Sequence, residues 1–220
     1  MASIGERIIE IKKEIPATTQ LVAVSKYFPA DAITEAYKAG HCIFGESRAQ
    51  ELKEKYALLP KDIEWHFIGH LQINKVKYIA PFVSLIHGVD SFKLLQEIDK
   101  QAAKHQRIID CLLQLHVACE ETKFGYSPEE CLEMLSQKEW KKLAHIKIRG
   151  VMCMASNVDN ETQIAQEFHT AYTFFQEAKE QFFQADKDFN ICSWGMSDDY
   201  HIAIQEGSNM IRIGSKIFKS

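Results

Sequence analysis

The chain has 220 residues, of which 46% are hydrophobic and 25% charged, with 10 Gly and 5 Pro. This composition supplies a sizeable core and excludes a disordered chain, a collagen and a coiled coil. The formal net charge of −4 argues against nucleic acid or a membrane surface as the partner, because both need a basic face.

No segment reaches the ~18 uninterrupted apolar residues that a membrane span needs. The N-terminus mixes Glu, Lys and Arg into its apolar positions, which does not fit a signal peptide. The cysteines are Cys42, Cys111, Cys119, Cys131, Cys153 and Cys192. They are far apart and form no CxxC pair, so we expect neither structural zinc nor disulfides, and free thiols suit the cytoplasm.

From the N-terminus onward, short apolar runs alternate with longer segments of helical periodicity. An amphipathic helix opens the chain, with isoleucines three or four positions apart from Ile4 to Ile15, and ends at Pro16. Eight apolar runs follow, at residues 21–25, 42–46, 65–69, 85–90, 111–117, 148–154, 191–195 and 210–214. The clearest helical segment between them spans residues 160–183, where one apolar stripe recurs.

Strands that alternate with helices must be parallel, because each crossover helix returns the chain to the same end of the sheet. Eight such units in 220 residues come close to the lower limit for a (β/α)8 barrel. A doubly wound sheet has fewer strands and a glycine-rich loop after the first, but residues 25–29 contain no glycine. The prediction is a single (β/α)8 TIM barrel with an extra N-terminal helix, forming one domain over residues 1–220.

In such barrels the site lies at the C-terminal ends of the strands. Lys26 continues the first run, so we expect its amine at the barrel mouth, where desolvation favours the neutral form that attacks a carbonyl. A lysine that snorkels to solvent is the alternative. Residues 193–199 and 212–215 supply hydroxyls and glycines after runs seven and eight, where these barrels commonly hold a phosphate. Taken alone, these hydroxyl and glycine residues could simply form turns and helix caps. Their occurrence together with Lys26 indicates a phosphorylated carbonyl compound as the ligand.

Other candidate residues point to structural roles. His66 and His70 are four apart, but they lie in and after a strand-like run with no following carboxylate, so no metal site is expected. Glu46 could be a general base, but we expect it to be hydrogen-bonded, because a buried carboxylate must be paired. Side chains expected to line the core or mouth, or to be solvated, are Met152, Cys153, Met154, Lys75 and Lys123.

Several longer motifs carry a family resemblance. They are LVAVSK at 21–26, FGESRAQE at 44–51, WHFIGHLQINK at 65–75, RGVMCM at 149–154 and the segment 193–218. Together they resemble the YggS/PROSC family of pyridoxal-phosphate-binding proteins, whose barrel is similar to the N-terminal domain of alanine racemase and of eukaryotic-type ornithine decarboxylase. Ser47 stands where the family usually has Asn, and the chain ends in IFKS where members commonly have Gly after Phe.

The resemblance also implies a cofactor and a set of binding residues. Pyridoxal 5′-phosphate would be held as a Schiff base on Lys26, and Arg212 would face the pyridine nitrogen. Ser197, Gly214 and Ser215 would bind the phosphate. The expected cofactor-binding set is completed by His66, Met154 and Ser193.

The function that the resemblance implies is non-catalytic: storage, buffering or delivery of pyridoxal phosphate in vitamin B6 and amino-acid homeostasis. A two-base racemase needs a second acid/base group, which related racemases take from a second domain, and 220 residues leave no room for one. An arginine beside the pyridine nitrogen also weakens the electron sink of the cofactor. We expect a cytoplasmic monomer with pyridoxal-phosphate-dependent apoenzymes as partners. The alternatives are a racemase or lyase using the same cofactor, and a cofactor-free Schiff-base aldolase.

Overall fold

The computed structural model describes residues 2–120 and 124–219. Within this part of the chain, eight parallel strands pair in chain order, and β8 pairs with β1 to close the sheet into a barrel. The strands are β1 (Gln20–Val24), β2 (Ile43–Glu46), β3 (Glu64–Phe67), β4 (Leu85–Val89), β5 (Ile109–Gln114), β6 (Ile146–Met152), β7 (Ile191–Ser193) and β8 (Met210–Ile213). Each strand overlaps one of the predicted runs, so the predicted (β/α)8 barrel is confirmed.

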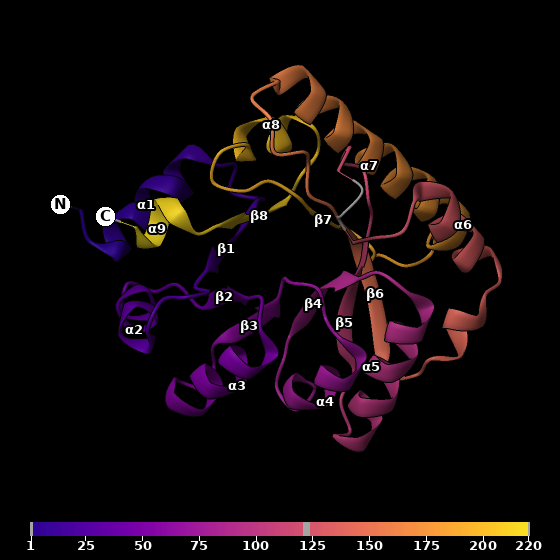
Figure 1. Ribbon diagram of the computed structural model, residues 1–220, viewed down its shortest axis with the longest axis horizontal. Helices are drawn as coiled ribbons and strands as arrows, with labels where there is room; N and C mark the ends of the chain where they lie inside the picture. The colour runs from indigo at the N-terminus through magenta and orange to yellow at the C-terminus, as the bar shows by residue number, and fades with distance from the viewer. Residues whose placement is uncertain (1, 121–123, 220) are drawn as a thin grey trace.

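Helices form a layer outside the strands (Figure 1). They are α1 (Ile4–Glu14), α2 (Ala30–Lys38), α3 (Ala49–Leu58), α4 (Val76–Ile79), α5 (Phe92–Lys104), α6 (Pro128–Ser136), α7 (Glu161–Phe182), α8 (Tyr200–Gln205) and α9 (Ser215–Phe218), with 3-10 turns η1 (Ile73–Lys75) and η2 (Glu139–Lys142). Local sequence determines where two of these helices begin. Ser127 and Glu130 form a capping box at the start of α6, and the Asn160 side chain accepts the Gln163 N–H at the start of α7. No helix in the described ranges combines the length and apolar character that crossing a bilayer requires.

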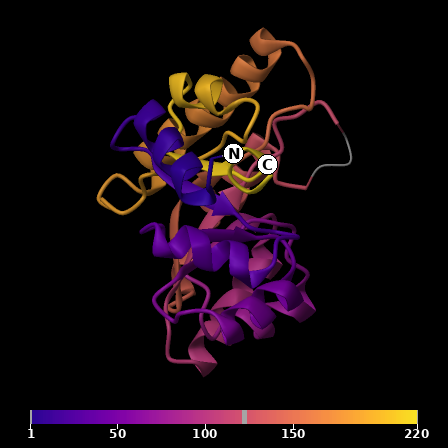
Figure 2. The ribbon, with the colours of Figure 1, turned by 90° about the vertical axis from the view of Figure 1, so that its left-hand side faces the viewer.

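The predicted extra helix α1 packs beside the C-terminal helix α9. A capping box between Ser3 and Glu6 starts α1, and Ile8 and Ile11 are buried on its inner face. Arg7 Nη1 donates to the Lys219 carbonyl at 3.3 Å, so the first and last helices are tied together. Figure 2 shows the two ends of the chain next to one another. The loop before α9 lies beside the end of β1, where a Cβ at position 214 would be 3.2 Å from the Val24 carbonyl oxygen.

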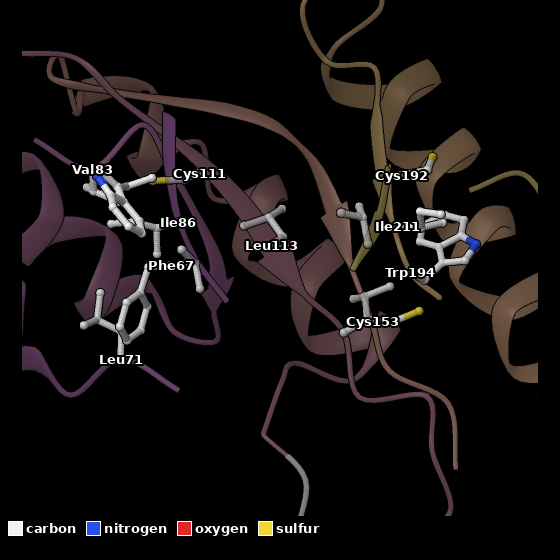
Figure 3. Packing of buried hydrophobic residues seen from close by; sticks show 14 of the residues in the cluster. Phe67, Leu71, Val83, Ile86, Cys111, Leu113, Cys153, Cys192, Trp194 and Ile211 are labelled. Atoms are coloured by element: carbon white, nitrogen blue, oxygen red, sulfur yellow. The ribbon is translucent and has the colours of Figure 1, made fainter. Parts of the chain in front are cut away.

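The core has two parts, one inside the barrel and one between strands and helices. Phe67, Ile86 and Trp194 are among the side chains of the outer part (Figure 3). The barrel interior is filled by Val22, Leu85, Leu112, Met152 and Met210. Two residues after Leu85, Leu112 and Met210, where the same face of each strand recurs, the side chains are His87, Gln114 and Arg212. Ser193 of β7 is hydrogen-bonded between His87 and Arg212. An apolar plug therefore closes the amino end of the barrel, and a polar layer lies above it.

Candidate functional site

A cavity of about 480 Å³ opens at the carboxyl end of the barrel. Its volume lies within the range of small-molecule sites. Six of the eight predicted cofactor-binding residues line it: Lys26, Met154, Ser197, Arg212, Gly214 and Ser215. A larger hollow of about 770 Å³ lies at the amino end, which is the end where barrel enzymes do not place their active sites. We therefore take the carboxyl-end cavity as the candidate site.

Lys26 lies in the turn that follows β1 and is half-buried at the cavity wall. Its ammonium has no hydrogen bond or ion pair with any residue in 2–120 or 124–219. The ring centroid of Tyr27 lies 5.9 Å from Lys26 Nζ. Lys26 therefore offers the cavity an amine that makes no hydrogen bond or ion pair within the described ranges.

The loops after β7 and β8 supply hydrogen-bond donors at one end of the cavity. Ser197 is buried, and its hydroxyl accepts the Gly214 N–H at 3.4 Å. The backbone N–H groups of Ser197 and Ser215 have no acceptor within the described ranges. A Cβ at position 214 would lie 3.2 Å from the Val24 carbonyl oxygen, so glycine keeps this approach open. Hydroxyl and N–H donors arranged in this way suit an anion.

Arg212 extends from β8 into the barrel and is 3% exposed. Its Nη1 donates to both the carbonyl and the hydroxyl oxygen of Ser193, each at 2.7 Å, and Nη2 donates to the Cys153 carbonyl at 2.9 Å. Burial lowers the pKa of Arg212 from its ordinary value, but a guanidinium in a protein keeps its proton. The result is a fixed positive charge at the floor of the cavity.

Two neutral histidines continue the hydrogen-bond chain from Arg212. Ser193 Oγ lies 3.0 Å from His87 Nδ1, and His87 Nε2 lies 3.1 Å from His66 Nδ1. Burial lowers the pKa of His66 to about 3, and burial together with the electrostatic effects of His66 and Arg212 lowers that of His87. His66 and Ser193 do not line the cavity; they lie in the layer beneath it. Ser193 contacts Arg212 directly, and His66 is linked to it through His87 and Ser193, so both residues belong to the support of the site.

Sequence reasoning missed the wall formed by His70, Gln114 and Phe124. The His70 ring stacks on Phe124 with centroids 3.7 Å apart, and its Nδ1 lies 2.9 Å from Asp90 Oδ2. Gln114 Nε2 donates to the Phe124 carbonyl at 2.9 Å. The position of His70 soon after a strand is the signal that could have placed it at the barrel mouth, whereas its spacing from His66 raises only the question of a metal site. Within the described ranges, no three His, Cys, Asp or Glu side chains gather in a way that could hold a metal.

The remaining candidates are placed as follows. Glu46 is buried and paired, as expected, but its partners Ser25 and Lys55 lie on the outer side of the barrel wall. Ser47, where the sequence departs from the family pattern, lines the cavity. Lys75 lies outside the cavity, 5.5 Å from the ring centroid of Tyr78. Lys123 falls outside the described residues.

Fold and site together define a class of protein: a parallel barrel that presents a lysine amine after β1 and anion-binding donors after β7 and β8. Such a site suits a phosphorylated aldehyde or ketone. The chain belongs to the family described as alanine racemase, N-terminal domain, whose profile matches residues 1–220.

Named relatives narrow this assignment. A pyridoxal phosphate homeostasis protein of Aquifex aeolicus is 36% identical over 204 residues, which cover 90% of this chain and 86% of the relative. One of Helicobacter pylori is 38% identical over 202 residues, covering 91% and 87%. PipY of Synechococcus elongatus, solved without and with pyridoxal phosphate, is 35% identical, with TM-scores of 0.92 and 0.88 and coverage of 98% and 99%. The resemblance inferred from the motifs is confirmed.

A more distant comparison concerns the fold alone. Alanine racemase of Clostridium difficile is 16% identical, has a TM-score of 0.77, and matches 98% of this chain but 55% of its own. The barrel of this chain therefore corresponds to part of that enzyme.

Proposed function

We propose that the chain binds pyridoxal 5′-phosphate without catalysis and serves pyridoxal phosphate homeostasis. The observation that carries the proposal is the lining of one cavity. Lys26, whose amine has no hydrogen-bond partner within the described ranges, lines it together with the buried Arg212 and the hydrogen-bond donors of Ser197 and Ser215. The names of the relatives at 36% and 38% identity support it, as does the binding of this cofactor by PipY.

The residues present fit this cofactor. Lys26 would form a Schiff base with the aldehyde, which is the linkage that holds the group when bound. Ser197, Gly214 and Ser215 would hold the phosphate through hydroxyl and N–H groups. Arg212 would lie toward the pyridine nitrogen. Met154 would contact the ring. Ser193 would act from the layer beneath through Arg212, and His66 would act through His87 and Ser193.

Arg212 supplies the physical reason for the lack of catalysis. Pyridoxal phosphate serves amino-acid chemistry as an electron sink, which is strongest when its ring nitrogen is protonated. A guanidinium has no acceptor atom and carries its own positive charge, so beside that nitrogen it opposes protonation. Three hydrogen bonds to Ser193 and Cys153 fix its position, so it cannot turn away. The cofactor is then held with its reactivity reduced.

We further propose that residues 1–220 act as one domain, as a monomer in the cytoplasm, and that apoenzymes dependent on pyridoxal phosphate receive the cofactor. The free thiols of Cys42, Cys111, Cys119, Cys131 and Cys192 support a reducing compartment. The racemase or lyase and the cofactor-free aldolase are not favoured, because the relatives are named pyridoxal phosphate homeostasis proteins and PipY is solved with pyridoxal phosphate bound.

A titration with pyridoxal phosphate tests the proposal. The wild-type protein should gain the visible absorbance of a Schiff base, Lys26→Ala should not, and Lys75→Ala, altered outside the cavity, should behave as wild type. A protein that stays colourless with pyridoxal phosphate, yet forms a reducible adduct with a sugar phosphate, would favour the aldolase instead.

A further inference from the structure

A buried ion cluster lies behind the barrel wall at the end of β1. Lys55 of α3 is 6% exposed, and its ammonium donates to Glu46 Oε1 and to Glu51 Oε1, each at 2.7 Å. Ser25 Oγ donates to the same Glu46 oxygen at 2.6 Å. We call these four residues the Lys55 cluster: Ser25, Glu46, Glu51 and Lys55. None of them lines the cavity.

The Lys55 cluster holds the backbone on both sides of Lys26. Lys55 Nζ donates to the Ser25 carbonyl at 2.8 Å, on the N-terminal side. Glu51 Oε1 accepts the Tyr27 N–H at 2.8 Å, on the C-terminal side. Because Lys55 and Glu51 also bond to one another, the hydrogen bonds form a closed ring around the backbone of Lys26. The lysine side chain is left out of this ring and lines the cavity.

The backbone at this turn needs such support. Tyr27 has a φ of 70°, in the left-handed region that residues with a side chain rarely adopt. Tyr27 is also 67% exposed, so packing of its ring does not impose this conformation. Strained backbone persists where the surroundings over-determine it, and here the surroundings are the bonds to Glu51 and Lys55.

The charges of the cluster support the same role. Burial raises the pKa of Glu46 despite its bonds to Lys55 and Ser25. Burial acts in the same sense on Glu51, but the hydrogen bonds from Lys55 and from the Tyr27 N–H outweigh it and lower the pKa of Glu51. Glu51 therefore stays ionised at neutral pH and can hold both partners.

We propose that the Lys55 cluster positions Lys26 for its attack on the aldehyde of the cofactor, although no member of the cluster lines the cavity. The inference rests on the proposed function. In the step concerned, the neutral amine nitrogen bonds to the aldehyde carbon, and its two protons leave with the carbonyl oxygen as water. A backbone fixed on both sides restricts the directions open to the side chain, so less orientational freedom is lost when the bond forms.

Measuring the binding of two ligands shows whether the Lys55 cluster positions the Lys26 amine or only maintains the shape of the cavity. Pyridoxal 5′-phosphate can bond to Lys26, whereas pyridoxamine 5′-phosphate carries an amine in place of the aldehyde and cannot. Lys55→Met should weaken pyridoxal phosphate binding about tenfold or more, which is the range for losing a hydrogen bond to a charged group. It should change pyridoxamine phosphate binding by no more than about twofold.

Lys53→Met is the matched control, because Lys53 lies exposed on the same helix and contacts the Tyr78 ring. It should shift both affinities by no more than about twofold. If Lys55→Met does not fold, Glu51→Gln is measured in the same way and should show the same selective loss. Equal losses for the two ligands, or no loss for either, would overturn the inference. Failure of the wild-type protein itself to bond pyridoxal phosphate at Lys26 would instead contradict the proposed function.

Discussion

Replacing Ser193 with alanine tests the hydrogen-bonded layer beneath the cavity. The Ser193 hydroxyl is fully buried, accepts from Arg212 Nη1 at 2.7 Å and lies 3.0 Å from His87 Nδ1. Ser193→Ala removes this oxygen, while Arg212 keeps its bond to the Ser193 carbonyl. A hydrogen bond to a charged group contributes about 1.5–3 kcal/mol, and an unpaired buried imidazole nitrogen adds a further cost. We expect the free energy of unfolding to fall by about 2–3 kcal/mol.

Urea unfolding of the two proteins measures this difference, provided that the slopes of the transitions agree. Ser136→Ala is the control, because Ser136 is exposed at the end of α6 and its hydroxyl bonds only to the Glu133 carbonyl among the described residues. It should change stability by less than about 0.5 kcal/mol. A loss that small for Ser193→Ala would refute the reasoning, because it would mean that the hydroxyl is not held between the guanidinium and the imidazole.

Three further predictions concern the phosphate, the pH and the chemistry. Ser197→Ala should weaken pyridoxal phosphate binding by about 1–2 kcal/mol and leave unphosphorylated pyridoxal unaffected; equal losses would place its role elsewhere. Burial, aided by Lys12, lowers the pKa of His41 to about 4, so the unfolded chain takes up the proton first as pH falls below the ordinary value of 6.5. Between pH 7 and pH 4.5 the wild type should thus lose about 2 kcal/mol more stability than His41→Gln, measured by urea unfolding at each pH; equal losses would contradict this. With L-alanine in deuterated water, no rapid Lys26-dependent deuterium should enter the α-carbon, and D-alanine formation would favour the racemase.

The strands and the longest helix could be predicted because local patterns determine them. Strands buried on both faces give continuous apolar runs, and each of the eight runs overlaps a strand. The apolar stripe in residues 160–183 is found as α7, which begins after the cap at Asn160. Lys26 and Gly214 could be placed at the mouth because each lies within two residues of the carboxyl end of a strand.

Contacts across the closed barrel could not be predicted in this way. His87 and Ser193 are 106 positions apart and meet only because the sheet closes on itself. Strand tilt and stagger set the depth at which an inward side chain lies, so the sequence assigns His66 and Ser193 to the cofactor-binding set although neither lines the cavity. Lys55 gave no signal, because a lysine on a helix normally faces solvent.

Borohydride reduction of the protein incubated with pyridoxal phosphate, followed by peptide mapping, tests the central claim most directly. The amine of Lys26 makes no hydrogen bond or ion pair within the described ranges, and Lys26 lines the same cavity as Ser197 and Ser215, whose backbone N–H groups have no acceptor there. The account predicts one pyridoxyl group per chain, on Lys26, and none in Lys26→Ala. Recovery of the label mainly on Lys75 or Lys123, or no incorporation at all, would contradict it.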